Sequence, residues 1–423
     1  MTLAAAMGLW WCALIVMLFG SAALALMQPW VAAGRASNEK RPPVSVLVPL
    51  REAGEAESVA NASIIGLDYP ELEVLFSVKE ADQGKVQDDG VEHTSPSERC
   101  GEGGPTKSGR MGCGPLTGPH WEKMWAAGHT PSGLAGQVHL PYFVEKANRA
   151  ARFIETAARP GFNPKIANLL QPLDAAAHDF LLVKDAGTAL APGTLAAMMR
   201  GFVAGTGLVC AVPIGRAPRS FAASVEAALI NTYGARLVLA ASVLGAGAGL
   251  GAAMLLDRRD LRAAGGLGAI ATTIADDHAL AKILGRRGLR TVLAVPTVDQ
   301  DLGARRFADV WRRHLRWAVC RRVEEPMAFH AEPLVGLVAA CLAAWFGADW
   351  LGISWALLFA AAIVLWPLAE MILAILKGWP VTAGMPFAII LREMLMPVLW
   401  LAALLTREIA WGSTRIPVRR RRS

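Results

Sequence analysis

Hydrophobic residues are concentrated at the two ends of the 423-residue chain, with a mixed region between them. Residues 1–34 carry no charged side chain, and the apolar run at 9–27 is long enough to cross a hydrocarbon core of about 30 Å as a helix. The small residues Ala23 and Ala25 favour a cleaved signal peptide as the alternative. The run is too long for that and lacks a preceding basic segment. We therefore predict an N-terminal transmembrane helix within residues 1–34.

The region after this helix alternates short apolar runs with helical segments. Residues 44–50 (VSVLVPL) and 72–78 (LEVLFSV) are predicted strands, separated by a polar helix near 55–65. Further buried strands are predicted at 180–183 and 207–212. Strand, helix and strand at this spacing favour a parallel sheet, so the fold class is α/β.

Two segments interrupt this alternation. Residues 221–256 are apolar but contain Glu226, Arg236 and Asp257 together with many glycines, which favours a buried or interfacial element over a membrane span. Residues 84–158 are rich in Gly, Ser, Glu, His and Lys and lack periodicity over most of their length. They predict a long irregular surface insertion that is partly disordered.

The C-terminal part of the chain is again membrane-like. Three apolar stretches, at 334–346, 353–375 and 386–405, predict membrane helices within residues 330–408, and a basic tail follows at 409–423. If all three cross, the tail lies opposite the central domain, contrary to the positive-inside rule. Two crossings with one interfacial or re-entrant helix keep it on the same side, and this arrangement is slightly favoured.

Basic residues set the expected orientation. Arg35, Lys40 and Arg41 follow the first helix, which predicts that the domain spanning residues 43–325 faces the cytoplasm. The expected location is therefore a membrane crossed several times, the inner membrane if the source is bacterial.

Composition agrees with a membrane protein. The chain is 54% hydrophobic and 18% charged, against about 25% charged in typical soluble domains. Its 42 Lys and Arg exceed its 35 Asp and Glu by seven. Because the basic residues cluster beside apolar stretches and at 419–422, they favour an anionic membrane surface and not nucleic acid as partner.

Charged residues follow several predicted strands. Glu80 and Asp82 follow the second strand, Asp185 follows the third, and Asp276 and Asp277 lie in IADDHAL. Ligands of open α/β sheets bind beyond the carboxyl ends of the strands. A single acid there is more often a turn former or helix cap, which could be the whole role of Asp276. A basic and aromatic cluster lies further on, in RHLRW: Arg313, Arg316 and Trp317.

Taken in order, these motifs resemble the family 2 and family 21 glycosyltransferases, and most closely the ceramide glucosyltransferases. The resemblance runs from about Val44 to Trp411, apart from the insertion. It is carried by VSVLVPLREAG, LDYPELEVLFSVKEAD, NPKIANL, KDAGTALAPGTL, GLVCAVP, AAGGLGAIATTIADDHALAKILGRRG and RRHLRW.

The resemblance implies a GT-A fold, a Rossmann-like domain that binds a nucleotide sugar at the membrane surface. It implies transfer of a sugar from a UDP-sugar to a lipid hydroxyl, with Mg²⁺ or Mn²⁺ as cofactor. By motif match, Asp277 is the catalytic base and Asp185 holds the metal and diphosphate. The family's first acid is usually Asp; here Glu80 stands there and Asp82 could replace it. The remaining donor-binding positions are Lys165, Arg313, Arg316 and Trp317.

The residue chemistry agrees with these roles. A sugar nucleotide already carries a good leaving group, so transfer needs one base and cationic help for the departing diphosphate. Carboxylate oxygen suits Mg²⁺ or Mn²⁺, and Arg is a planar bidentate donor to phosphate. Trp317 could stack on sugar or uracil, or anchor the chain at the membrane interface.

Several functions remain open at this point. The favoured one is inverting transfer of glucose to ceramide, because DAG at 185–187 matches the ceramide type. Diacylglycerol and hopanoid acceptors are alternatives, as is a processive polysaccharide synthase. A transporter or membrane scaffold with a soluble domain is the alternative of a different class. A transporter would need charged residues inside its apolar segments to form an ion or substrate path, and this chain has few of them. Glu370, Arg392 and Glu393 are the exceptions.

Overall fold

The computed structural model describes residues 2–34, 37, 39–50, 59–79, 150–157, 159, 161–411 and 414–418. The predicted donor-binding residues Glu80 and Asp82 lie outside these ranges, as does most of the predicted insertion.

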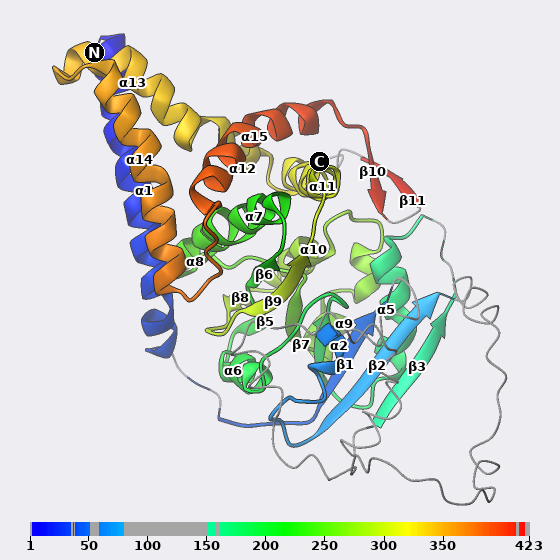
Figure 1. Cartoon of the computed structure of the whole chain (residues 1–423). Coiled ribbons are helices and arrows are strands. Elements are labelled where there is room, and N and C mark those ends of the chain that lie inside the picture. Colours follow the sequence, from blue (N-terminus) through cyan, green and yellow to red (C-terminus); the bar gives the residue numbers. More distant parts are fainter. Residues whose placement is uncertain are drawn as a thin grey trace, which may run out of the picture.

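A mixed sheet of seven strands forms the centre of the described structure, in the order β3-β2-β1-β4-β7-β5-β8 (Figure 1). β7 runs antiparallel to both of its neighbours, and the other pairings are parallel. The predicted α/β class is therefore confirmed. The strands are β1 (Val44–Pro49), β2 (Leu72–Lys79), β3 (Ala150–Thr156), β4 (Phe180–Lys184), β5 (Thr206–Cys210), β7 (Ala253–Asp257) and β8 (Arg290–Leu293).

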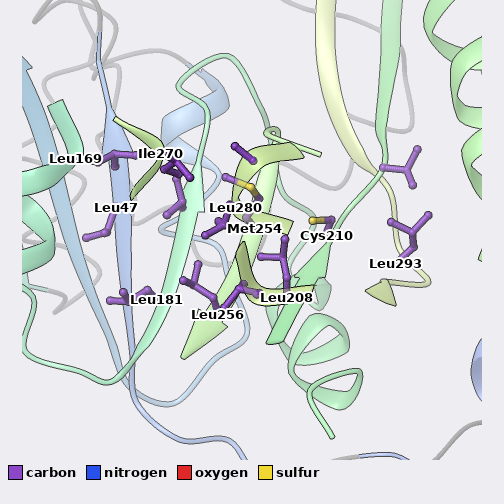
Figure 2. Packing of buried hydrophobic residues seen from close by; sticks show 14 of the residues in the cluster. Leu47, Leu169, Leu181, Leu208, Cys210, Met254, Leu256, Ile270, Leu280 and Leu293 are labelled. Atoms are coloured by element: carbon purple, nitrogen blue, oxygen red, sulfur yellow. The ribbon is translucent and has the colours of Figure 1, made fainter. Parts of the chain in front are cut away.

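Helices cover both faces of this sheet. Side chains alternate along a strand, so Leu47 of β1 faces one core while Val46 and Val48 face the other. The first core joins the sheet to α5 (Pro164–Ala175) and α10 (Asp276–Gly285), and Figure 2 shows its packed leucines. The second core joins the opposite face to α6 (Thr194–Arg200). Smaller helical elements complete the domain: α2 (Val59–Ala62), α9 (Arg258–Ala263) and η4 (Leu267–Ile270).

The apolar stretch at 221–256 is a buried element of the domain, as predicted. It forms α7 (Phe221–Ala227), the π-helical η3 (Ala228–Ala235) and α8 (Arg236–Val243), and ends in strand β7. Asn231 of η3 accepts from the backbone N–H of Gly215 at 2.8 Å and donates to its carbonyl at 3.0 Å. These bonds join η3 to a separate two-stranded parallel sheet, β6 (Pro213–Pro218) with β9 (Val298–Gly303).

The C-terminal helices divide into two groups. After α11 (Phe307–Glu324), α12 (Pro326–Ala331) and η5 (Glu332–Leu334), α13 (Leu337–Leu351) and α14 (Trp355–Leu376) pack beside α1 (Leu3–Ala33) (Figure 1). In contrast, α15 (Met385–Leu405) lies over α7 and α11. In the described ranges, α1, α14 and α15 are long and apolar enough to span a membrane, and α12–η5 with α13 forms a broken candidate span bent by 50°. The chain is therefore a multi-pass membrane protein.

The charges predicted to interrupt the apolar helices pair with one another. The Nη2 of Arg392 in α15 lies 2.7 Å from Glu370 of α14 and 3.1 Å from Glu393. Glu370 also accepts from Thr232 of η3 at 2.5 Å, and all these side chains are buried. Buried charges are costly unless they are paired, and this network joins α14 and α15 to η3 of the central domain.

One expectation about local structure is wrong, and the structure adds detail to two others. The end of the predicted insertion, residues 150–156, forms strand β3, which Arg152 ties to Glu73 at 2.6 Å. The predicted basic tail begins with a hairpin, β10 (Glu408–Trp411) and β11 (Thr414–Pro417), whose Ile409 is buried under α11. The described part of the helix predicted near 55–65 is the single turn α2. Strand β3 and the C-terminal hairpin show no clear apolar alternation in their sequences. They form because tertiary contacts stabilise them.

Candidate active site

Three elements that are distant in sequence bring together a lysine and its acidic partners. The Nζ of Lys165, in the first turn of α5, lies 2.8 Å from Oδ1 of Asp185 and 3.0 Å from Oδ2 of Asp276. Asp185 directly follows β4, and Asp276 begins α10. The Asp185 side chain is 41% exposed, whereas that of Lys165 is only 10% exposed. A nearly buried ammonium group therefore joins an accessible carboxylate to a buried one.

Asparagine side chains fix the position of α5. Asn163 caps this helix by accepting from the Lys165 N–H at 2.9 Å, and its Nδ2 donates to the Thr273 carbonyl at 2.9 Å. One turn later, Nδ2 of Asn168 donates to the carbonyls of Leu50 and Ser77, at the ends of β1 and β2. The motif NPKIANL thus ties the sheet edge to the loop before α10.

Asp277 sits beside this cluster with both oxygens engaged. Its Oδ2 accepts from the Gly251 N–H at 2.9 Å and its Oδ1 from the His278 N–H at 2.8 Å. Burial and the negative charge of Asp276 raise the pKa of Asp277 to about 6, although the Lys165 cation opposes the shift. The carboxyl is therefore ionised at neutral pH yet basic enough to take a proton.

A glycine-rich segment before β7 presses against this acid. A Cβ on Gly249 would lie 2.1 Å from the Asp277 carbonyl oxygen, and one on Gly251 would lie 3.2 Å from both Asp277 Oδ2 and Lys165 Nζ. Only glycine lets the backbone approach so closely. This contact was not predicted from the sequence, although the alternating glycines of GAGAGLG are a signal of a close backbone approach.

The second half of the site lies on α11. Arg313 donates from Nη2 to Gln300 at 2.7 Å and from Nη1 to Glu226 at 3.1 Å, and its guanidinium lies 4.7 Å from the centre of the Trp317 ring. Residues three and four positions apart share a helix face, which places Arg316 and Trp317 beside Arg313. Neither Gln300 nor Glu226 is among the residues that the sequence predicts for the site.

Trp317 is partly buried against the protein interior. Its ring contacts the apolar cluster formed by α7, η3 and Leu302 of β9. Its predicted interfacial role has no support in these contacts, and Arg313 covers one of its faces.

The two halves of the site interact electrostatically. Burial lowers the pKa of Arg313, and the negative charges of Glu226 and Asp185 oppose that shift. Asp185 is thus close enough for its charge to act on Arg313. In Lys165, the charges of Asp185 and Asp276 outweigh burial and raise the pKa, so the ammonium stays charged.

The donor set for a metal ion is limited. No three His, Cys, Asp or Glu side chains gather closely enough to hold a metal within the described ranges. Asp185 fits one role only, a single carboxylate ligand to a cation that phosphate oxygens of a substrate also hold, as is usual for Mg²⁺.

Comparison with known proteins decides the family. Residues 146–423 match the family described as Glycosyl transferase family 21. The chain belongs to this family. Family 21 members are glycosyltransferases, so this chain is a glycosyltransferase by family.

The similar proteins are distant. Ceramide glucosyltransferase 1 of Caenorhabditis elegans is 23% identical over 294 residues, which cover 68% of this family 21 enzyme and 63% of that relative. The chain thus spans less than two thirds of the relative's length.

Two solved structures are also similar. A mannosyltransferase of Pyrobaculum calidifontis, solved with GDP-Man and Mn²⁺, is 17% identical with a TM-score of 0.44, covering 94% of this chain and 98% of that one. Glucosyl-3-phosphoglycerate synthase of Mycobacterium tuberculosis, solved with Mn²⁺, UDP and phosphoglyceric acid, is 13% identical with a TM-score of 0.30, covering 69% and 79%.

Proposed function

We propose that this family 21 enzyme transfers glucose from a UDP-sugar to a membrane lipid hydroxyl, with ceramide as the acceptor. The observation that carries the proposal is Asp277, a carboxyl with a raised pKa held beside the Lys165–Asp185–Asp276 cluster. Asp185 of this cluster lies close enough for its charge to act on Arg313 of α11. A base and a diphosphate-stabilising cation are the two groups that sugar transfer from a nucleotide requires.

The reaction is a single displacement. Asp277 accepts the proton of the lipid hydroxyl, whose oxygen attacks the anomeric carbon as the bond to the diphosphate breaks. Because the acceptor enters opposite the leaving group, the configuration at the anomeric carbon inverts. Arg313 and Arg316 offer donors to the negative charge that grows on the diphosphate, which needs no general acid.

Asp185 is the residue that would hold Mg²⁺ or Mn²⁺, with phosphate oxygens of the donor as further ligands. The metal would neutralise diphosphate charge as the sugar leaves. Lys165 holds Asp185 and Asp276 at fixed positions, so its ammonium supports the donor site through these acids. Glu80 and Asp82 remain the candidates for nucleotide contact.

The acceptor follows from two weaker observations. The relative at 23% identity is named a ceramide glucosyltransferase, and DAG at 185–187 matches that type. Diacylglycerol and a hopanoid polyol present the same hydroxyl at the same surface, and a processive synthase would use the same base. The nature of the product separates these possibilities.

The arrangement of the apolar helices supports a membrane orientation. Gly8 near the start of α1 lies against Gly347 near the end of α13, whereas Ala22 and Ala25 share a cluster with Leu373 near the end of α14. Hence α13 is antiparallel to α1, and α14 is parallel to α1 (Figure 1). With α13 and α14 as the two crossings, α15 and the C-terminal hairpin return to the side of the catalytic domain. This side is cytoplasmic by the positive-inside rule.

The test uses the full-length protein in nanodiscs, incubated with labelled UDP-glucose, UDP-galactose or UDP-N-acetylglucosamine and with ceramide, diacylglycerol or a hopanoid. One labelled glucose on ceramide, with inverted anomeric configuration, is the expected product. A labelled polymer would support a synthase. Absence of both transfer and UDP-sugar binding would contradict the enzyme proposal.

A further inference from the structure

Glu226 is a buried acid on the opposite side of the site from the aspartates. It lies in α7 with 1% of its side chain exposed. Its Oε1 accepts from Nη1 of Arg313 at 3.1 Å, and its Oε2 forms an ion pair with Nε of Arg305 at 3.3 Å. Removing a carboxylate from water is costly unless cations compensate it, so this acid requires both arginines.

The contacts of Glu226 fix one of these arginines in particular. Arg313 is held on three sides, by Glu226, by Gln300 at 2.7 Å and by the ring of Trp317. A guanidinium is planar, so two hydrogen bonds and a stacked ring define both its position and its plane. Such a group stabilises developing charge without reorganising during the reaction.

The charge of Glu226 has no other assigned use. The ring of His314 lies 3.9 Å from Oε1, but burial and the neighbouring arginines lower the pKa of His314 well below its usual range. His314 is therefore neutral and cannot compensate the carboxylate. Glu226 also lies outside the cluster of Lys165 and its acids, so a role as base is not supported.

We infer that Glu226 is a positioning residue for sugar transfer: it orients Arg313 toward the donor diphosphate, and Arg305 balances its second oxygen. This inference rests on the proposed function, because it assigns Arg313 to the leaving group. The positioning role explains why a charged side chain is buried within the apolar stretch at 221–256. The effect is expected on kcat more than on donor KM, since the charge on the diphosphate grows in the transition state.

The first experiment compares Glu226→Gln with Glu332→Gln in the full-length protein. Glu332 pairs with Arg321 of the same helix at 2.5 Å and serves as the matched control. We expect kcat to fall about 10- to 100-fold in Glu226→Gln and to change less than about twofold in Glu332→Gln, with similar donor KM. Equal kcat in Glu226→Gln and the parent would overturn the inference.

A double-mutant cycle separates positioning from a purely structural role. If Glu226 acts through Arg313, adding Glu226→Gln to Arg313→Lys lowers kcat by less than about twofold further. Losses that multiply, together with a lower melting temperature, would show a structural role and overturn the inference. If Glu226→Gln does not fold, Glu226→Asp is used in the same cycle. It keeps the charge but retracts it, and a loss of at least about threefold that disappears beside Arg313→Lys is expected.

The parent enzyme keeps this failure distinct from failure of the proposed function. If the parent transfers no sugar to any lipid, the proposed function fails and Glu226 has no diphosphate to serve. If the parent transfers sugar and both Glu226 variants match it, only the positioning role is wrong.

Discussion

The acidic and basic halves of the site are built alike but with opposite charges. In each half, a buried charged side chain lies between two side chains of the opposite charge. In the acidic half, the buried Lys165 cation lies between Asp185 and Asp276. In the basic half, the buried Glu226 anion lies between Arg305 and Arg313. Each half thus contains an internal counter-ion and still keeps an excess of its own sign.

The difference between the halves is how they are built. The acidic half is assembled from α5, the end of β4 and the start of α10, and glycine backbone presses against it. The basic half is presented mainly by one helix, α11, whose Arg322 donates to the Leu404 carbonyl at 2.7 Å and the Thr406 carbonyl at 2.8 Å at the end of α15. An acidic half held by the sheet and a cationic helix attached to the apolar helix α15 fit the proposed reaction between a soluble donor and a lipid.

Removal of divalent metal is expected to have the largest effect on the acidic half. EDTA should abolish transfer and added Mn²⁺ or Mg²⁺ should restore it, because in the proposed reaction a cation beside Asp185 would neutralise the charge of the donor diphosphate. Asp185→Ala should weaken metal-dependent UDP binding measured by calorimetry. Full activity in EDTA would show that transfer does not require a divalent metal.

The basic half is tested by Arg316→Lys. Lysine keeps the charge but loses the bidentate geometry, so kcat should fall at least about tenfold in detergent with a short-chain acceptor and no anionic lipid. Arg312→Lys is the control, since Arg312 is exposed and pairs with Asp309. Parent-like turnover of Arg316→Lys would mean that this arginine only attracts headgroups.

The pH dependence probes the acidic half alone. As the proposed base, Asp277 must be ionised to accept a proton, and its pKa is raised to about 6. Activity should therefore rise as the pH increases through about 6, with kcat about tenfold lower at pH 5 than on the plateau. A kcat that stays constant from pH 5 to pH 7, in protein shown to remain folded, would exclude this titration.

The smallest effect is expected from the backbone contact. Gly251→Ala places a methyl group 3.2 Å from Oδ2 of Asp277 and Nζ of Lys165, so kcat should fall several-fold, by roughly 1 kcal/mol of transition-state stabilisation. Gly285→Ala, at the end of α10, is the control, because a Cβ there has no neighbour within 4 Å. Equal losses in both variants would show that the contact has no special role.

The sequence predicts those parts of the molecule that local pattern determines. Strands β1 and β2 are buried apolar runs, and the acid Asp185 directly follows such a run at β4. Strand β3 escapes prediction because its short edge sequence depends on pairing with β2 and on the Arg152–Glu73 ion pair.

The site is predictable in its residue types but not in its contacts. Asp277 and Arg313 lie in recognisable motifs. Gly251 and Glu226 do not, because each acts through a partner 26 or 87 residues away. Such pairs become visible only when the fold brings the segments together.

The proposed mechanism depends most on Asp277, as the base of the sugar transfer. The most direct measurement compares the parent with Asp277→Asn for both UDP-sugar binding and single-turnover transfer to ceramide in nanodiscs. We predict unchanged donor affinity and transfer at least about 100-fold slower, because the amide cannot accept the hydroxyl proton. Near-normal transfer by Asp277→Asn would contradict the account and move the role of base to Asp276 or to another residue.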